Sequence, residues 1–488
     1  MSEALRTQFD HYLATGETPL GPEGEAPMGE AGPAPGPLSL ARFHLFDGRG
    51  RVKGVYDWEV CRHIKETQEM FVMGGVPYLY EGGCFRPDES GAKVKTMIRG
   101  CCYPEFIKAP TIRRIYDLLI GDADLQTTFE AVNRCPAHWI NFRNGFYDPV
   151  ARKMIPHDPA YRVINQIPHA FDPERKPHGQ ELEAWLRFIT PDPEDRRMLL
   201  EFAGYCMTRD VSQQKFLILN GEGGTGKSTV IRLIEAMIGS ENLASISLSE
   251  LSQRFAAYGL VGKLLNSCAD LELTALEDTS TIKKVLGEDT LRGEAKGKDA
   301  FSFKSYARLI FSTNELPIVK SEKSNGFYRR LLILPMNRVP KARRPDLFQA
   351  LLLEIDDLIT LCVRALEEMY LAGGLRESPA SKEAVDQFRM DSDTVAAFLA
   401  EETTPDPSAR TERGVLFTAY KRYCFESDRQ ALTRNNFYRS MRVKGFRETA
   451  SMGAWYFSGL KIGKLKKKDP IQTALEKGYV EVDEVLPF

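Results

Sequence analysis

The chain has 488 residues, with 65 Lys and Arg against 67 Asp and Glu, so its formal net charge is −2. Hydrophobic residues make up 43% and charged residues 27%, which excludes wholesale disorder, a collagen-like repeat and a disulfide-stapled miniprotein, while the length predicts about three domains. The near-neutral sum does not exclude a nucleic-acid partner, because acidic segments can hide a local basic patch.

The nine cysteines form no CxxC pair and no zinc-type spacing, which indicates reduced thiols. The N-terminus lacks a basic segment followed by an apolar one, and no stretch approaches the roughly 18 apolar residues that a membrane span needs. We therefore expect a cytoplasmic chain with no membrane partner.

The N-terminal third divides into a tether and a first domain. Residues 1–39 hold a short helical pattern and then a stretch dense in Pro, Gly and Glu, which predicts a disordered linker. Residues 40–180 are predicted to form an α+β domain. Its expected elements are two strands over 77–88, a helix over 109–123 and a hairpin region over 140–159.

From residue 181 the pattern changes to helices that alternate with apolar strands. This alternation predicts a central α/β P-loop domain over 181–375, built on a mainly parallel sheet with both faces covered. A smaller domain is expected over 376–488. The helices expected before the sheet span 181–189 and 193–208, and the expected strands span 215–220, 262–269, 307–314 and 330–336.

The sequence Gly221-Glu-Gly-Gly-Thr-Gly226-Lys227-Ser228 matches the G-x-x-x-x-G-K-[ST] motif, between an apolar run and an amphipathic helix. Its glycines let backbone N–H groups surround phosphates, and the helix N-terminus adds its dipole. We expect Lys227 to reach the β- and γ-phosphates of ATP and Ser228 to bind Mg²⁺; the alternative is a plain glycine-rich turn. The expected nucleotide-binding residues are Gly221, Gly223, Gly224, Thr225, Gly226, Lys227, Ser228 and Thr229.

Hydrolysis requires an acid on a neighbouring strand. Asp270 and Glu272 follow the apolar run 262–269, and their spacing of two puts them on one face of an extended chain. We assign Asp270 to Mg²⁺ and Glu272 to the attacking water, with the two roles open to exchange. The alternative is a solvated strand end.

Two further polar elements follow. Asn314 ends an apolar strand, where it can hydrogen-bond the γ-phosphate or the attacking water, or merely cap the turn before Pro317. Arg329 and Arg330 precede the next strand, and an arginine there can neutralise charge on the γ-phosphate of a neighbouring subunit. The alternative is a pair of ordinary surface arginines.

The order of these segments resembles the superfamily 3 helicase domain of phage and plasmid replication proteins in the D5-like group, the P4-type primase C-terminal family. The resemblance covers about residues 140–340. It implies an AAA+-like fold and an ATP hydrolase that works as a hexameric 3′-to-5′ DNA helicase in a bacterial or phage-infected cell. It also implies that Asp270 and Glu272 are the Walker B acids, Asn314 the sensor, and Arg330, or Arg329 in second place, the arginine finger.

In this family the DNA-gripping hairpin lies between the Walker B acids and the sensor. The matching segment is 290–303, and it offers Arg292, Lys296 and Lys298 as DNA contacts. Contacts to backbone phosphates need only accessible cations and carry no sequence information. The alternative is a solvated turn.

The C-terminal region contains the basic patch that the net charge hides. A helix expected over 433–446 carries Arg434, Arg439, Arg442 and Lys444, and the segment 452–468 resembles a wing with a basic tail. Helix and wing together are typical of duplex DNA readers, and similar family members often end in a winged helix. The alternative is a solvated helix.

Primase activity is often attributed to relatives of this family. Asp122 and Asp124 are the one close acid pair of that pattern upstream of the motor, and no matching histidine motif accompanies them. We therefore do not expect primer synthesis by this chain alone, and we leave open whether a separate primase or polymerase docks on it.

The first hypothesis is a replicative helicase of a phage, plasmid or integrated element. It would use ATP and Mg²⁺ and act on single-stranded DNA and an origin duplex as a homohexamer. The second is an ATP-switched replication initiator that binds DNA without processive unwinding. A small-molecule P-loop kinase is a third, and it leaves Asn314, Arg330 and the basic tail without a role.

Overall fold

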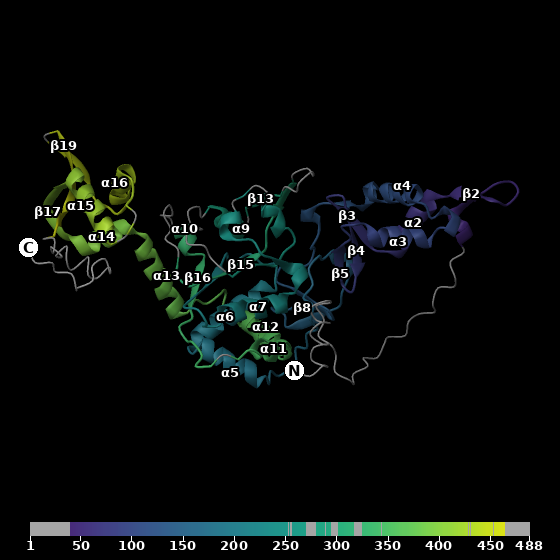
Figure 1. Cartoon of the computed structure of the whole chain (residues 1–488), viewed down its shortest axis with the longest axis horizontal. Coiled ribbons are helices and arrows are strands. Elements are labelled where there is room, and N and C mark those ends of the chain that lie inside the picture. The colour runs from purple at the N-terminus through teal and green to yellow at the C-terminus, as the bar shows by residue number, and fades with distance from the viewer. Residues whose placement is uncertain are drawn as a thin grey trace, which may run out of the picture. The chain divides into compact units, whose positions relative to one another are not determined.

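The computed structural model describes residues 40–463, apart from 252, 254–255, 270–279, 288, 294–300, 317–324, 343, 428, 430 and 452. The chain divides into two compact units between Val385 and Asp386 (Figure 1). The expected boundary at 375/376 lies ten residues earlier, and the limits of the four predicted segments stay predictions. Among the described residues, no helix is long and apolar enough to cross a bilayer. All nine cysteines are free thiols.

The N-terminal part of the first unit packs three α-helices against small sheets. Helix α4 carries Ile112, Ile115 and Leu119 on one side, and all three are buried in a core shared with α2 and α3. A four-stranded sheet has the order β5-β4-β3-β6. The elements are η1 (Leu40–Phe43), β1 (His44–Phe46), β2 (Val52–Val55), α2 (Asp57–Thr67), β3 (Met70–Met73), β4 (Val76–Glu81), β5 (Cys84–Pro87), α3 (Ala92–Gly100), η2 (Pro104–Phe106), α4 (Ala109–Ile120), η3 (Ala123–Leu125), β6 (Gln126–Thr127) and η4 (Phe129–Ala131).

The predicted hairpin region over 140–159 belongs to the core of the central sheet. Ile140, Phe142 and Tyr147 share one hydrophobic cluster with the strands and helices around the P-loop. Helices α6 and α12 (Ile355–Leu371) approach closely at Gly204, where a Cβ would lie 2.3 Å from the Cys362 carbonyl oxygen. The elements are β7 (Ile140–Phe142), β8 (Gly145–Asp148), β9 (Lys153–Ile155), η5 (Pro159–Tyr161), α5 (Gln180–Ile189) and α6 (Pro193–Cys206).

The central sheet has five parallel strands in the order β11-β12-β15-β10-β16. Strands β10, β15 and β16 are almost wholly buried, as their mainly apolar sequences predict. The four predicted strands appear as β10, β12, β15 and β16. The elements are β10 (Phe216–Asn220), α7 (Lys227–Ile238), η6 (Ser240–Asn242), β11 (Leu243–Ala244), α8 (Leu248–Leu251), η7 (Ala256–Leu260), β12 (Leu265–Cys268), α9 (Ser280–Leu286), β13 (Thr290–Gly293), β14 (Phe301–Lys304), β15 (Arg308–Thr313), α10 (Asn325–Tyr328), β16 (Leu331–Pro335), α11 (Leu347–Leu353) and α12 (Ile355–Leu371).

Because these strands are parallel, their carboxyl ends meet at one edge of the sheet, where α/β proteins place their ligand sites. The P-loop follows β10 at this edge. Asn314 follows β15, the neighbour of β10, and Ala269 follows β12, the next strand across.

The second unit is small and has its own hydrophobic core. Its helices bury Phe398, Tyr420 and Phe437 against one face of a three-stranded antiparallel sheet with the order β17-β19-β18. The predicted helix over 433–446 is present. The elements are α13 (Pro379–Ser392), which crosses the boundary, α14 (Thr394–Glu402), β17 (Thr403–Glu412), α15 (Arg413–Glu426), α16 (Arg434–Val443), β18 (Glu448–Ser451) and β19 (Ala454–Ile462).

Candidate functional site

The P-loop connects β10 to α7 through backbone conformations that glycine favours. Gly221 has φ of 157°, and a Cβ there would lie 2.0 Å from the Met336 carbonyl oxygen, so a side chain does not fit. Gly224 and Gly226 have φ of 86° and 97°. The loop therefore needs at least three of its four glycines for backbone reasons alone.

Lys227 lies at the start of α7 with its side chain folded back over the loop. It is 8% exposed, and its Nζ donates hydrogen bonds to the carbonyl oxygens of Gly221 and Glu222. It also donates to Oδ1 of Asn314 at 2.9 Å. The structure thus brings together the two residues that the sequence places after neighbouring strands.

The residues on either side of the start of α7 have the chemistry to hold a phosphate and a metal ion. Thr225 is buried and donates to the Glu222 carbonyl at 3.0 Å, which closes the loop on itself. Ser228 and Thr229 are the second and third residues of α7; Ser228 is exposed and Thr229 is half-buried. A hydroxyl at this position is an oxygen ligand of the kind Mg²⁺ takes, and the helix N-terminus favours anions.

The end of β12 is held beside the end of β15. Ser312 donates its hydroxyl to the carbonyl of Ala269, the residue before Asp270. Asp270 and Glu272 themselves lie outside the described residues, so their assignment stays a prediction.

The two candidate arginines have different surroundings. Arg330 donates to the Gly326 carbonyl at 2.6 Å and to Oε1 of Gln214 at 2.9 Å, whereas Arg329 is exposed. Burial, with a smaller effect from the charge of Arg329, lowers the pKa of the Arg330 guanidinium. Sequence reasoning missed Gln214, because no local signal links it to a residue so far along the chain.

The arginine pair also lies at the opposite edge of the sheet from the P-loop. The Phe216 N–H, at the start of β10, donates to the Arg330 carbonyl at 2.9 Å. Lys227 follows the other end of this five-residue strand. At about 3.3 Å per residue, the first and last residues of this strand are roughly 13 Å apart, which separates the Arg330 backbone from the start of the P-loop.

The predicted DNA-gripping segment forms a hairpin. Strands β13 and β14 pair antiparallel with Arg292 opposite Ser302, and Arg292 is exposed. Lys296 and Lys298 lie outside the described residues, so their role stays a prediction.

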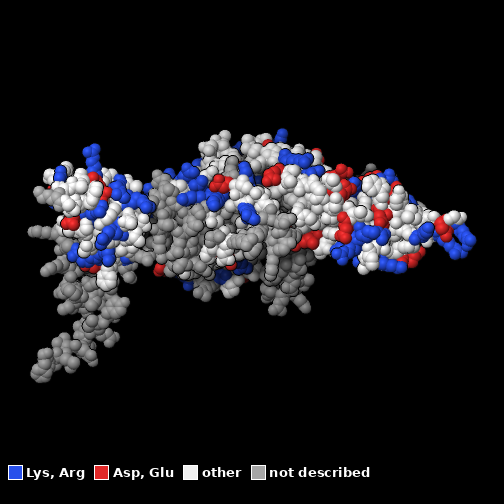
Figure 2. Space-filling view, turned by 90° about the horizontal axis from the view of Figure 1, so that it is seen from above, with Lys and Arg blue, Asp and Glu red and all other residues white. Residues whose placement is uncertain are grey.

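The predicted cations of α16 are only partly available. Arg442 pairs with Glu448 at 2.7 Å, and Lys444 pairs with Asp393. Arg434 lies 5.5 Å from the ring centroid of Phe417, and Arg439 is exposed. Figure 2 shows that many basic side chains gather on one face of this unit. Sequence reasoning missed these two acids, of which Glu448 also pairs with Arg413 at 2.8 Å, and the DNA contacts of the four cations stay a prediction.

The acid pair at 122 and 124 has a structural role. Asp122 accepts a hydrogen bond from Lys65 at 2.6 Å and caps η3 through the Asp124 N–H. The Lys65 hydrogen bond lowers the pKa of Asp122, although burial opposes it. These contacts give Asp122 a structural role, while the Asp124 carboxylate is mostly exposed and lies 3.5 Å from Lys65.

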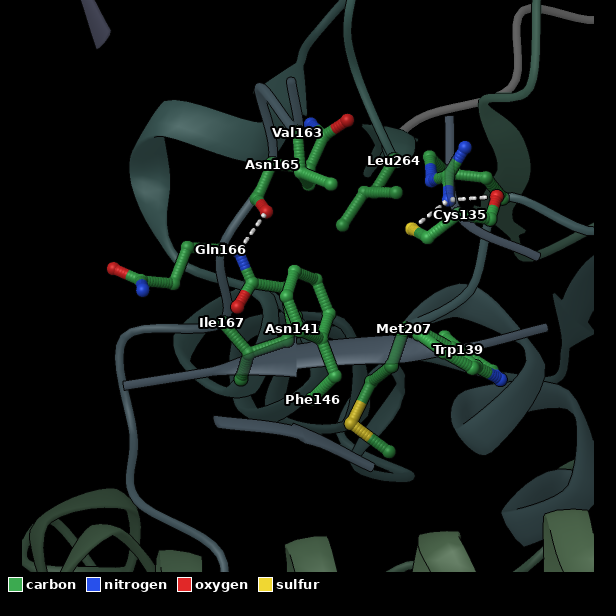
Figure 3. A pocket seen from close by; sticks show the side chains of 11 residues that line it. Cys135, Trp139, Asn141, Phe146, Val163, Asn165, Gln166, Ile167, Met207 and Leu264 are labelled. Carbon is green, nitrogen blue, oxygen red and sulfur yellow. Dashed lines mark hydrogen bonds between the residues drawn. The ribbon is translucent and has the colours of Figure 1, made fainter. Parts of the chain in front are cut away.

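An enclosed cavity lies under the β7–β8 hairpin (Figure 3). Its volume of about 10 Å³ is room for about one water molecule. Asn141 crosses it to donate to the Asn165 carbonyl at 2.9 Å, and Arg209 donates to Sγ of Cys135 on its rim. The cavity is far too small for a nucleotide.

Comparison with known proteins yields two family matches. Residues 102–191 match the family described as D5 N terminal like, and residues 219–330 match a family of unknown function, DUF5906. These matches confirm the resemblance to D5-like replication proteins.

One curated relative and two solved structures are also similar. The protein named "Putative helicase L207/L206" of Acanthamoeba polyphaga mimivirus is 27% identical over 206 residues, which are 40% of this chain and 21% of that protein. The chain thus matches about a fifth of that relative's length. The A form apo structure and another apo structure of the NrS-1 C-terminal region align at 12% identity and a TM-score of 0.46, over 83% of this chain and 99% of theirs.

Proposed function

We propose that the chain is an ATP-driven DNA helicase of superfamily 3 that serves the replication of a phage, plasmid or integrated element. The observation that carries this proposal is the contact between Lys227 and Asn314, because it joins a phosphate-binding loop to a polar group after the neighbouring strand. A plain glycine-rich turn without a nucleotide site would not require a contact between this lysine and Asn314. The helicase-like name of the mimivirus relative and the D5-type segment support the same class of function.

The residues take the following roles in ATP hydrolysis. The loop N–H groups and the N-terminus of α7 bind the phosphates, and Lys227 neutralises the β- and γ-oxygens. Ser228 and Asp270 would hold Mg²⁺, which would neutralise negative charge on the phosphates. Glu272 orients the attacking water. Asn314 contacts the γ-phosphate or that water, and so reports which nucleotide is present.

The arginine of the site comes from a neighbouring copy. Arg329 and Arg330 lie at the sheet edge opposite their own P-loop, so neither reaches it within one chain. Arg329 takes the catalytic role, because this residue is exposed, while Arg330 is held by Gly326 and Gln214. Head-to-tail contacts of this kind close into a ring, here a hexamer that moves 3′ to 5′ along single-stranded DNA.

The second unit is a winged-helix domain that binds origin duplex. Its order of helix, strand, two helices and two strands supports this assignment, with α16 as the recognition helix and the β18–β19 turn as the wing. Arg439 on α16 is exposed and is the proposed DNA contact of this helix. This unit also favours the second candidate function, a DNA-binding initiator that does not unwind.

Subunit mixing tests the shared site. Lys227→Ala and Arg329→Ala should each abolish ATP hydrolysis, while an equimolar mixture regains activity because about a quarter of its interfaces hold both an intact lysine and an intact arginine. A mixture as inactive as its components would overturn the trans assignment. Unchanged hydrolysis by Lys227→Ala would overturn the nucleotide site.

Strand displacement separates the two candidate functions. On a forked DNA substrate with ATP, the helicase releases the labelled strand, and Lys227→Ala releases none. An initiator binds the fork and hydrolyses ATP but leaves the strands paired, which would reject the first function in favour of the second.

A further inference from the structure

A cationic groove lies between α3 and α4, in a part of the chain to which the helicase proposal gives no role. It is open and has a volume of about 550 Å³. Four of its lining side chains are basic and one, Asp117, is acidic. The basic ones are Lys95, Arg99, Lys108 and Arg113.

The cations of the groove are largely uncommitted. Arg99 and Lys108 are exposed, and neither forms an ion pair with another described residue. Arg113 and Asp117 lie 3.7 Å apart, but both side chains are mostly exposed, so their attraction is weak. Lys95 donates to the Ser90 carbonyl at 2.8 Å and is otherwise directed at an aromatic ring.

The floor of the groove is apolar and aromatic. Ile107 is 43% exposed although it is a large aliphatic residue. The Lys95 ammonium lies 4.8 Å from the ring centroid of Tyr116, which itself packs over Gly91. The first turn of α4, at Ala109, opens onto the same groove and adds the positive end of a helix dipole.

We propose that this groove binds single-stranded DNA. Cations along a concave surface follow the phosphate backbone, while exposed aliphatic and aromatic groups contact sugars and unstacked bases. Duplex DNA offers its bases only in the grooves of a wide cylinder, so it cannot use the apolar floor. The groove thus holds the strand outside the motor, independently of ATP.

Photo-crosslinking in the full chain tests this site. A benzoylphenylalanine in place of Ile107 should crosslink to labelled oligothymidylate, whereas the same group in place of the exposed Val150 should not. Arg99→Ala with Lys108→Ala should weaken the crosslink about 25-fold at 0.1 M salt and reduce the salt slope by about 1.4, as expected for two lost phosphate contacts. Basal ATP hydrolysis should not change, because both side chains are exposed and neither belongs to the proposed nucleotide site.

Several results would overturn the proposal. The first is crosslinking of duplex DNA as strong as that of single-stranded DNA. The second is crosslinking of the groove to residues 17–30 or to a second copy instead of DNA. The third is a loss of crosslinking in the control pair Lys53→Ala with Lys153→Ala as large as in Arg99→Ala with Lys108→Ala. The Lys227→Ala chain should keep the crosslink. The experiment therefore tests DNA binding by the groove independently of the proposed ATPase activity.

Discussion

Gly221→Ala is the sharpest test of the P-loop geometry. The added Cβ would lie 2.0 Å from the Met336 carbonyl oxygen, about 1 Å or more inside the closest approach of real Cβ atoms, and its φ of 157° adds strain. The obstacle is backbone next to β16, so it cannot rotate away. Overpacking of this kind costs about 2–3 kcal/mol, or roughly 3–4 °C in a unit of about 350 residues.

The assay compares thermal and urea unfolding of Gly221→Ala and Gly223→Ala without nucleotide, followed by ATP affinity. Gly223 is a matched control, because a Cβ there meets nothing within 4 Å. We expect a lower melting temperature and weaker ATP binding for Gly221→Ala, and an unchanged melting temperature for Gly223→Ala. Equal melting temperatures for the two variants would refute the reasoning.

Three further predictions concern charged residues. Arg330→Ala should lower the free energy of unfolding in urea by about 1–3 kcal/mol, because it leaves Gln214 unpaired. Arg329→Ala should leave this free energy unchanged. Equal stabilities of the two variants would contradict the separate roles of the two arginines. Glu448→Gln should release Arg442 and raise duplex affinity about eightfold at 0.1 M salt in a titration, while lowering stability. Asp357 is buried, yet bonds from Arg175 and the His178 N–H lower its pKa. The ionised Asp357 carboxylate therefore contributes its full stabilisation above about pH 4, and this contribution is lost as the pH falls through the lowered pKa. In urea unfolding, Asp357→Asn should remove this part of the pH dependence of the free energy of unfolding.

The P-loop and its neighbours could be predicted because each depends on local sequence. The run 215–220, the glycines and the helix that follows are one continuous signal, and the structure has β10, the loop and α7 in those places. The sequence could predict that Lys227 and Asn314 lie near each other, because the carboxyl ends of parallel strands meet at the same edge of the sheet. The insertion of β15 between β10 and β12 was not predictable, because strand order depends on how crossover helices pack.

The charged residues show where sequence reasoning stops. It ranked Arg330 ahead of Arg329, and this ranking stays a prediction; it had no means of finding the hydrogen bond from Arg330 to Gln214, more than 100 residues earlier. It counted Arg442 and Lys444 as DNA contacts, but Glu448 and Asp393 hold them. A cation is free or paired according to tertiary placement, and neither periodicity nor composition reports that.

The position of β10 in the sheet has a consequence for synthesis of the chain. This strand is complete only when β15 and β16 pair on its two sides, and β16 ends about 115 residues after β10. At roughly 5–20 residues per second, a ribosome needs about 6–23 s to make that stretch. During this time the apolar segment Phe216–Leu219 has emerged without its partners, so a nascent chain stalled there would be a natural client for chaperones.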